Sequence, residues 1–189
     1  MKTLFAIMLT CAAAMAQTGS VAVVIETSMG SIEAEIALDK APLTSANFLR
    51  YVDAGRYQNA QFHRTVKLDN QPDNAVKIEV IQASLAPKVE PFPPVVLERT
   101  SLTGLTHTNG ALSMARGGPD TGAAEFFICI GDQPALDFGG KRNPDGQGFA
   151  VFGHVTKGMD IVRKIQAAPA MGQLLDPPVR ILRIVRKPA

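Results

Sequence analysis

Two stretches of the sequence, QFHRTV and EFFICI, place charged side chains close to aromatic rings. Because side chains alternate between the two faces of a β-strand, an extended QFHRTV would present Phe62 and Arg64 on the same face. An extended EFFICI would likewise present Glu125 and Phe127 together. A sheet face with both large rings and charges suits neither a dry core nor a plain solvated surface, so we expect it to form the floor of a groove. The opposite face of the second strand would be filled by Phe126, Ile128 and Ile130.

Several common kinds of catalytic or metal site have no support in the sequence. His63, His107 and His154 stand alone, without the His-x-His or Cys-x-x-Cys spacing of a zinc site. FGGKR is not a phosphate-binding loop, and NPDGQG lacks the alternating oxygen ligands and distal glutamate of a calcium loop. No Gly-x-Ser-x-Gly elbow occurs, and Ser113 lies inside a strand pattern. We therefore expect no metal ion and no cofactor. No side chain stands in a motif typical of a catalytic nucleophile.

Residues 1–16 have the pattern of a signal peptide that is removed on export. A charged Met-Lys start leads into the apolar run LFAIMLTCAAAMA, which ends in an Ala-x-Ala site at Ala14–Ala16. Cleavage there predicts one mature domain, 17–189, with Gln17 as its first residue, in the periplasm or outside the cell. The alternatives are an apolar first strand and a lipoprotein signal at Cys11. A membrane anchor is disfavoured, because the run falls short of the roughly 20 residues that span a bilayer.

The charge balance and the cysteine content narrow the classes of function further. Lys and Arg number 19 against 17 Asp and Glu, and removal of Lys2 with the signal peptide leaves 18 against 17. A nearly neutral chain without a basic block gives no support for nucleic-acid binding. Removal of Cys11 leaves Cys129 alone, which excludes an internal disulfide and predicts a small buried side chain rather than a nucleophile. We expect a monomer that does not attach to a membrane after cleavage.

The elements that must position the groove are mostly short strands within one domain of a 189-residue chain. Alternation in VAVVIETSMGSIEAEIAL predicts an antiparallel hairpin with its turn at Met29–Gly30. Helical spacing predicts one helix in APLTSANFLRYVDAGRY, with Pro42 in its first turn and Gly55 as its cap, and a second helix over 158–166. Many short strands with only two helices predict a closed β-barrel whose open ends the helices cover. The remaining strands are expected at 61–66, 76–82, 111–115, 125–130, 149–155 and 179–187.

Four segments in a fixed order carry a resemblance to a known family. They are FHRTV (62–66), EVIQAS (79–84), GALSMARGGPDTGAAEFFICIGD (110–132) and FAVFGHVTKGMDIVRKI (149–165). Together they resemble the cyclophilin family of peptidyl-prolyl isomerases over almost the whole mature chain, and LSMAR with EFFI is the most specific part. The resemblance implies a mainly β fold, an eight-stranded antiparallel β-barrel with a helix at each end, which agrees with the barrel expected above. With the signal peptide, it implies an isomerase of the exported bacterial type.

The resemblance gives Arg64 a catalytic role. The bond before proline isomerises slowly, because amide resonance must be broken between the cis and trans forms. In the twisted transition state the prolyl nitrogen regains a lone pair, and a guanidinium aimed at it would stabilise that state more than the planar ground state. The implied function is acceleration of X–Pro isomerisation without a covalent step. The implied partners are proline-containing segments of exported or unfolded proteins.

The resemblance also implies a peptide groove around that arginine. Phe127 and Leu136 would line the pocket for the proline ring, with Val80 where the family commonly has Met. Gln82 would steady the arginine and the substrate carbonyl group. Backbone groups of an edge strand would receive an extended peptide by strand addition. These groups belong to Ala115 and to Arg116, where the family usually has Asn.

Several positions depart from the family pattern. The loop 65–77 is longer than usual, and Glu79 falls where the family often has a pocket Phe. Glu125 replaces a Gln at the groove and brings a carboxylate that we expect to pair with the arginine. Ala135 replaces a Trp or Phe of the pocket wall. Phe149 replaces a His of the groove, in a segment that is also lengthened.

These departures keep a second hypothesis open, in which the barrel is a low-activity chaperone or scaffold module that holds proline-containing segments. Retention of Arg64, Phe127 and Leu136 favours the enzyme. A third alternative, an unrelated small-ligand barrel such as a lipocalin, is disfavoured by the two helices and the irregular long loops.

Overall fold

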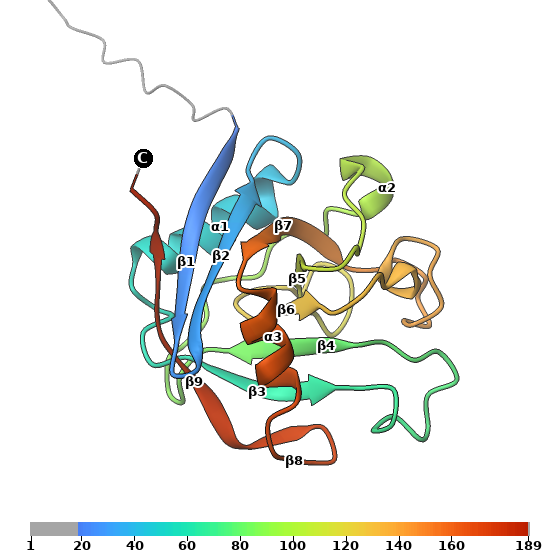
Figure 1. Ribbon diagram of the computed structural model, residues 1–189. Coiled ribbons are helices and arrows are strands. Elements are labelled where there is room, and N and C mark those ends of the chain that lie inside the picture. Colours follow the sequence, from blue (N-terminus) through green and yellow to red (C-terminus); the bar gives the residue numbers. More distant parts are fainter. Residues whose placement is uncertain (1–18, 189) are drawn as a thin grey trace, which may run out of the picture.

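Nine strands form one antiparallel sheet over residues 19–188, the part of the chain that this computed structural model describes (Figure 1). The predicted signal peptide and Gln17 lie outside the described residues. The strands are β1 (Ser20–Thr27), β2 (Gly30–Ala37), β3 (Gln61–Val66), β4 (Val80–Ser84), β5 (Ala111–Met114), β6 (Phe126–Cys129), β7 (Ala150–Lys157), β8 (Ala170–Met171) and β9 (Leu174–Arg186).

The sheet closes into a barrel of eight strands. Neighbouring strands follow the order β1-β2-β7-β5-β6-β4-β3-β9, and β9 pairs again with β1. In the closing ladder Val23 lies opposite Arg186, and the short β8 pairs only with β9. Closure protects the strand edges, which would otherwise pair with other chains. The predicted eight-stranded antiparallel barrel is confirmed.

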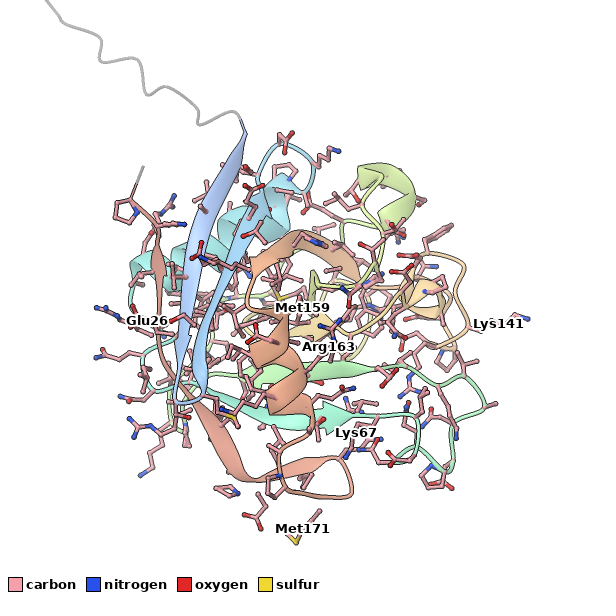
Figure 2. The ribbon with its side chains drawn as sticks, viewed as in Figure 1. Glu26, Lys67, Lys141, Met159, Arg163 and Met171 are labelled. Carbon is pink, nitrogen blue, oxygen red and sulfur yellow. The ribbon has the colours of Figure 1, made fainter. Side chains whose placement is uncertain are left out.

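Two helices cover the barrel as predicted. α1 (Pro42–Asp53) has its proline in the first turn and is followed by Gly55 with a φ of 63°, the left-handed conformation that ends many helices. α3 (Met159–Gln166) exposes Arg163 to solvent (Figure 2). Figure 1 shows α1 behind the β1–β2 hairpin and α3 at the front of the barrel. The four-residue α2 (Thr100–Thr103) was not predicted, since one short turn carries no apolar period.

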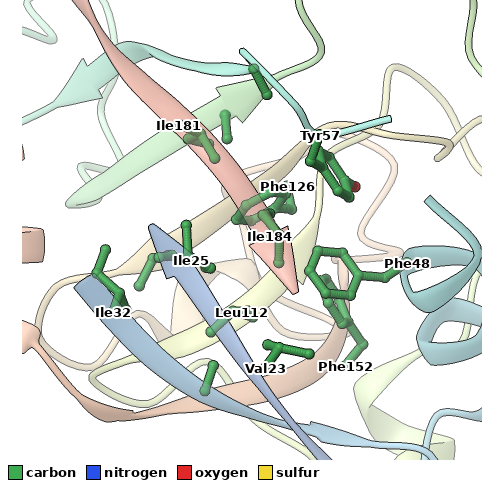
Figure 3. Packing of buried hydrophobic residues seen from close by; sticks show 14 of the residues in the cluster. Val23, Ile25, Ile32, Phe48, Tyr57, Leu112, Phe126, Phe152, Ile181 and Ile184 are labelled. Atoms are coloured by element: carbon green, nitrogen blue, oxygen red, sulfur yellow. The ribbon is translucent and has the colours of Figure 1, made fainter. Parts of the chain in front are cut away.

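A large apolar core fills the barrel and fixes the orientation of β6. The ring of Phe48 brings α1 onto this core, because its centroid lies 5.5 Å from that of Phe126 and 5.0 Å from that of Phe152 (Figure 3). All three rings are fully buried. Burial of one such side chain stabilises the fold by roughly 2 kcal/mol. With Phe126 inside, strand alternation turns Phe127 to the outer face of the sheet, as predicted.

The prediction that Phe62 and Arg64 share one face is wrong. Phe62 pairs with Ala83 and Arg64 with Gln82, so the register shifts by one residue at His63. A β-bulge of this kind sets two residues against one and turns the next side chain to the other face. Phe62 therefore points into the core, whereas Arg64 points outward. The period of two that a sequence pattern assumes breaks at the bulge.

The turn of the first hairpin also differs from the prediction by one position. Thr27 pairs with Gly30, so the two unpaired residues are Ser28 and Met29. The Thr27 side chain closes this turn, because its hydroxyl donates to the Gly30 carbonyl oxygen and accepts from the Met29 N–H. The hydroxyl thus fixes where pairing stops.

Candidate active site

Three neighbouring strands bring the predicted arginine, glutamine and phenylalanine into one row. Arg64 of β3 lies opposite Gln82 of β4, and Gln82 lies opposite Phe127 of β6. The outer faces of these three strands therefore form the floor of the predicted groove. The adjacent row, which faces the core, consists of Phe62, Ala83 and Phe126.

The outer row lines a cavity of about 330 Å³ whose lining is largely polar, with an apolar part formed around Phe127 and Leu136. Phe127 and Leu136 are 4% and 1% exposed, and the rings of Phe127 and Phe149 meet edge to face with centroids 5.3 Å apart. Such walls suit the ring of a proline, which has few polar atoms to leave unpaired. Eight of the nine predicted site residues line this cavity: Arg64, Val80, Gln82, Ala115, Arg116, Phe127, Leu136 and Phe149. Four further lining residues were not predicted, namely Asn74, Ile78, Arg142 and Asn143.

Two neutral amides hold the Arg64 guanidinium. Its Nη1 donates to Gln82 Oε1 at 2.9 Å, and its Nε and Nη2 donate to Gln173 Oε1 at 2.9 and 2.6 Å. Burial lowers the pKa of Arg64, and the charge of Glu125 opposes this shift. No carboxylate of residues 19–188 forms an ion pair with this guanidinium. Arg64 is thus fixed in place without a carboxylate in direct contact.

The expected direct pairing of Glu125 with Arg64 is not observed. Gln82 lies between them and donates from Nε2 to Glu125 Oε2 at 2.7 Å. The exposed Glu125 lines a neighbouring cavity of about 590 Å³, which shares Gln82 with the first one. The carboxylate therefore orients Gln82, and Gln82 orients the arginine. The amide of Gln82 bridges the two charged groups. A sequence pattern does not show that a third side chain lies between them.

Gln173 is a site residue that sequence reasoning missed. It follows β8 at the turn into β9, and its Nε2 donates to the Asn70 carbonyl oxygen at 3.0 Å. The Asn70 amide in turn donates to the carbonyl oxygens of Thr65 and Gly172. The lengthened loop and the β8–β9 hairpin therefore hold each other, and together they hold Arg64. No sequence signal could have found Gln173, since 109 positions separate it from Arg64.

The expected edge strand is not observed, because β5 pairs with both β6 and β7, and Ala115 and Arg116 follow its last residue. The Ala115 N–H already donates to the Glu125 carbonyl oxygen at 2.9 Å. The Arg116 guanidinium is turned to the lengthened segment, where it donates to both carboxylate oxygens of Asp145 and to the Gly148 carbonyl oxygen. Its side chain is only 1% exposed. Arg116 thus braces the rim of the cavity, and strand addition can use fewer backbone groups than predicted.

Two of the family departures fall outside the cavity lining. The Glu79 carboxylate accepts a hydrogen bond from Gln166 Nε2 at the end of α3, 3.1 Å away. Ala135 lies in a 3₁₀ turn, Pro134–Leu136, and only Leu136 of that turn reaches the cavity. Neither residue therefore adds a charge or a wall to the pocket.

A network of hydrogen bonds between buried polar side chains supports the floor of the cavity. His107 Nδ1 lies 2.6 Å from Asp137 Oδ1, its Nε2 lies 2.9 Å from Ser113 Oγ, and its ring stacks on Phe127. The Ser113 hydroxyl also donates to the Ala150 carbonyl oxygen. The order Ser, His, Asp is that of a hydrolase triad, but a serine with no exposed surface cannot attack a substrate. This hydrogen-bond network is a rigid support for the Phe127 ring.

Comparison with known proteins identifies the family. The family described as "Cyclophilin type peptidyl-prolyl cis-trans isomerase/CLD" matches residues 22–186. The peptidyl-prolyl cis-trans isomerase A of Dickeya dadantii is 36% identical over 153 residues, which cover 80% of this chain and 74% of the relative. The peptidyl-prolyl cis-trans isomerase B of Escherichia coli is 35% identical over 147 residues, which cover 76% and 83%. The chain therefore belongs to the cyclophilin-type peptidyl-prolyl cis-trans isomerases, which confirms the predicted family and enzyme class.

A solved structure supports the same fold. A cyclophilin-type isomerase of Cryptosporidium parvum, crystallised in the presence of the dipeptide Ala-Pro, superimposes with a TM-score of 0.70. It is 21% identical, and the match covers 89% of this chain and 99% of the other. None of the helices between residues 19 and 188 is long and apolar enough to cross a bilayer. Over the same range, no three His, Cys, Asp or Glu side chains are grouped to hold a metal ion.

Proposed function

We propose that this isomerase accelerates the interconversion of X–Pro bonds in unfolded exported proteins, by stabilising the twisted transition state with Arg64. The observation that carries the proposal is the position of the Arg64 guanidinium at a cavity walled by Phe127 and Leu136. The proline ring would fill the apolar part of that cavity, with its nitrogen turned to the guanidinium. The Ala-Pro dipeptide used with the Cryptosporidium parvum isomerase supports proline-containing peptides as substrates.

The neutral partners of Arg64 suit it to this role. An arginine paired with a carboxylate would direct its charge at that partner, whereas Gln82 and Gln173 fix the guanidinium through amide oxygens. The charge stays available for the lone pair that develops on the prolyl nitrogen. A hundred-thousandfold acceleration needs roughly 7 kcal/mol of transition-state stabilisation. The hydrogen bond to nitrogen, the dry walls and the fixed orientation would supply it together.

The kinetics of three proteins test this role. Isomerisation of a proline tetrapeptide is followed by exchange NMR with the wild type, Arg64→Ala and Arg163→Ala, after circular dichroism has shown that all three are folded. Arg163 lies on the exposed side of α3. Arg163→Ala therefore serves as a control, because it removes the same side chain and the same charge as Arg64→Ala. We expect acceleration by the wild type and by Arg163→Ala, and a loss of about a hundredfold in Arg64→Ala. Equal rates for Arg64→Ala and the wild type would refute the role of Arg64.

One observation favours a second candidate function, a module that holds proline-containing segments with little turnover. The Ala115 N–H is already bonded, so the segment after β5 offers fewer groups to position a substrate. The same kinetic comparison separates the two functions. Tight peptide binding with no acceleration by the wild type would establish the holding module.

The composition of residues 1–16 supports export to the periplasm or the medium. Expression of the full chain in a Gram-negative host, followed by cell fractionation and N-terminal sequencing, tests this part of the proposal. We expect periplasmic protein that begins at Gln17. Uncleaved protein in the cytoplasm would refute it.

A further inference from the structure

The cavity carries a second guanidinium that the isomerase mechanism does not use. Arg142 belongs to the lengthened segment before β7 and lines the same cavity as Arg64. Its Nη1 donates to the Val76 carbonyl oxygen at 2.6 Å, so the two lengthened loops meet at this bond. The side chain is half-buried. A charge on a long loop is therefore held at the cavity rather than free in solvent.

Neither Arg142 nor Arg64 has a carboxylate partner among residues 19–188. The third arginine of the cavity, Arg116, is different because Asp145 neutralises it at 2.8 Å. Burial lowers the pKa of Arg142, and repulsion from Arg64 lowers it further. A guanidinium keeps its proton even so. Two positive charges without a carboxylate in contact therefore face one cavity, and the group that complements them is an anion.

The cavity also offers hydrogen-bond donors to an anion. Arg142 Nε and Nη2 donate to no acceptor within the described part of the chain, and a guanidinium presents such donors in a fork that fits a carboxylate. These free donors of Arg142 fit an incoming oxygen acceptor.

The charge along the groove formed by the two neighbouring cavities changes from negative to positive. The neighbouring cavity carries the exposed carboxylate of Glu125, and the two cavities share Gln82, Ala115 and Arg116. An extended peptide that crosses from one cavity to the other would pass from a negative region to a positive one. Residues on the two sides of the proline therefore meet opposite charges.

We infer that Arg142, with the charge of Arg64 behind it, forms a subsite for the carboxylate of an acidic residue next to the proline, on the side away from Glu125. The inference rests on the proposed function, because it places the proline ring against Phe127. The chemical class of the preferred substrate is then a peptide with Asp or Glu beside the proline. An isosteric amide in the same place would lack the charge and bind less well.

Four peptides and two variants test the subsite. The peptides carry Glu or Gln directly before or directly after the proline and are otherwise identical. The variants are Arg142→Gln and Lys141→Gln. Lys141 is the neighbouring residue in the same loop, is exposed and does not line the cavity, and Figure 2 shows it pointing away from the barrel. Exchange NMR gives kcat/KM for each pair of protein and peptide, at low and at high salt.

We expect the wild type and Lys141→Gln to prefer the Glu peptide to its Gln counterpart by about fivefold at one of the two positions, the order of magnitude for one partly exposed ion pair. Arg142→Gln should lose this preference, so that its kcat/KM values for the Glu and Gln peptides become equal. High salt should reduce the preference, because it screens partly exposed charges. Equal kcat/KM for Glu and Gln peptides at both positions would overturn the inference while leaving the isomerase function intact.

The test also decides the inference if no peptide is accelerated. That result would refute the proposed function, and titration of the same peptides followed by chemical shifts would then give their dissociation constants. A preference for the Glu peptide that Arg142→Gln abolishes would support the subsite in a holding module. Equal dissociation constants for Glu and Gln peptides, or a preference that Lys141→Gln abolishes equally, would overturn it.

Discussion

Replacement of Gln173 by Ala removes two of the three side-chain hydrogen bonds that hold Arg64. A hydrogen bond from a charged donor contributes roughly 1.5–3 kcal/mol, and water entering the gap would replace most of that. The remaining loss, about 1.4 kcal/mol of transition-state stabilisation, corresponds to about a tenfold slower reaction. Because Gln173 does not line the cavity, KM should stay nearly constant and kcat should fall. The expected signature is thus a change in kcat alone.

A double-mutant cycle tells whether this loss passes through Arg64. Rates of peptide isomerisation are measured by exchange NMR for the wild type, Arg64→Ala, Gln173→Ala and the double variant. If Gln173 only positions the guanidinium, Gln173→Ala should slow the wild type about tenfold and leave the Arg64→Ala protein unchanged. Gln166→Ala serves as a matched control, since Gln166 also bonds through its amide but to Glu79 outside the cavity. An equal loss in both backgrounds would refute the positioning role, and no loss in either would show that Gln82 suffices.

Three further predictions concern the walls, the thiol and the rim. Phe127→Ala should raise KM and, because a nearly buried ring leaves a void, lower the free energy of unfolding by about 3 kcal/mol, measured in urea. Burial raises the pKa of the Cys129 thiol, so iodoacetamide at pH 8 should label it only after unfolding, and labelling of the native protein would contradict its burial. The Arg116 hydrogen bond holds the pKa of Asp145 below its usual value of 3.8, so this rim contact should persist from neutral to mildly acidic pH and be lost as the pH falls through that lowered pKa. Asp145→Asn should weaken peptide binding about twofold at pH 7, where the carboxylate is charged, and the difference from the wild type should disappear below the lowered pKa; equal binding by the two proteins at pH 7 would refute the role of the ion pair.

Local patterns were enough to predict the parts of the molecule in which neighbours along the chain decide the structure. The apolar stripe of α3 follows the helical period, and the alternation of Phe126 and Phe127 places the two rings in separate apolar clusters on the two faces of β6. The bulge at His63 lay beyond such patterns, since it depends on how β3 pairs with β4. The predicted face was therefore wrong for Phe62, whereas the Arg64 side chain lines the cavity.

The candidate site was predicted as far as the family resemblance reached. That resemblance pointed to Arg64, Gln82 and Phe127, which the barrel brings into one row. It could not point to Gln173, which lies beyond the four matching segments, or to Arg142, which lies in a lengthened segment. Their positions depend on contacts between distant loops, which no local period encodes.

The pairing of β9 with β1 has a consequence for how the enzyme becomes active. Glu26 and Arg183, which face each other across this closing ladder, are 157 positions apart in the chain. Contacts between such distant positions form late, since the intervening chain must first lose its freedom. Gln173, which steadies Arg64, directly precedes β9. An incomplete chain would therefore lack both the closed barrel and a fixed guanidinium, so that under the proposed function catalysis begins only when the C-terminal strand has been made and has joined the first.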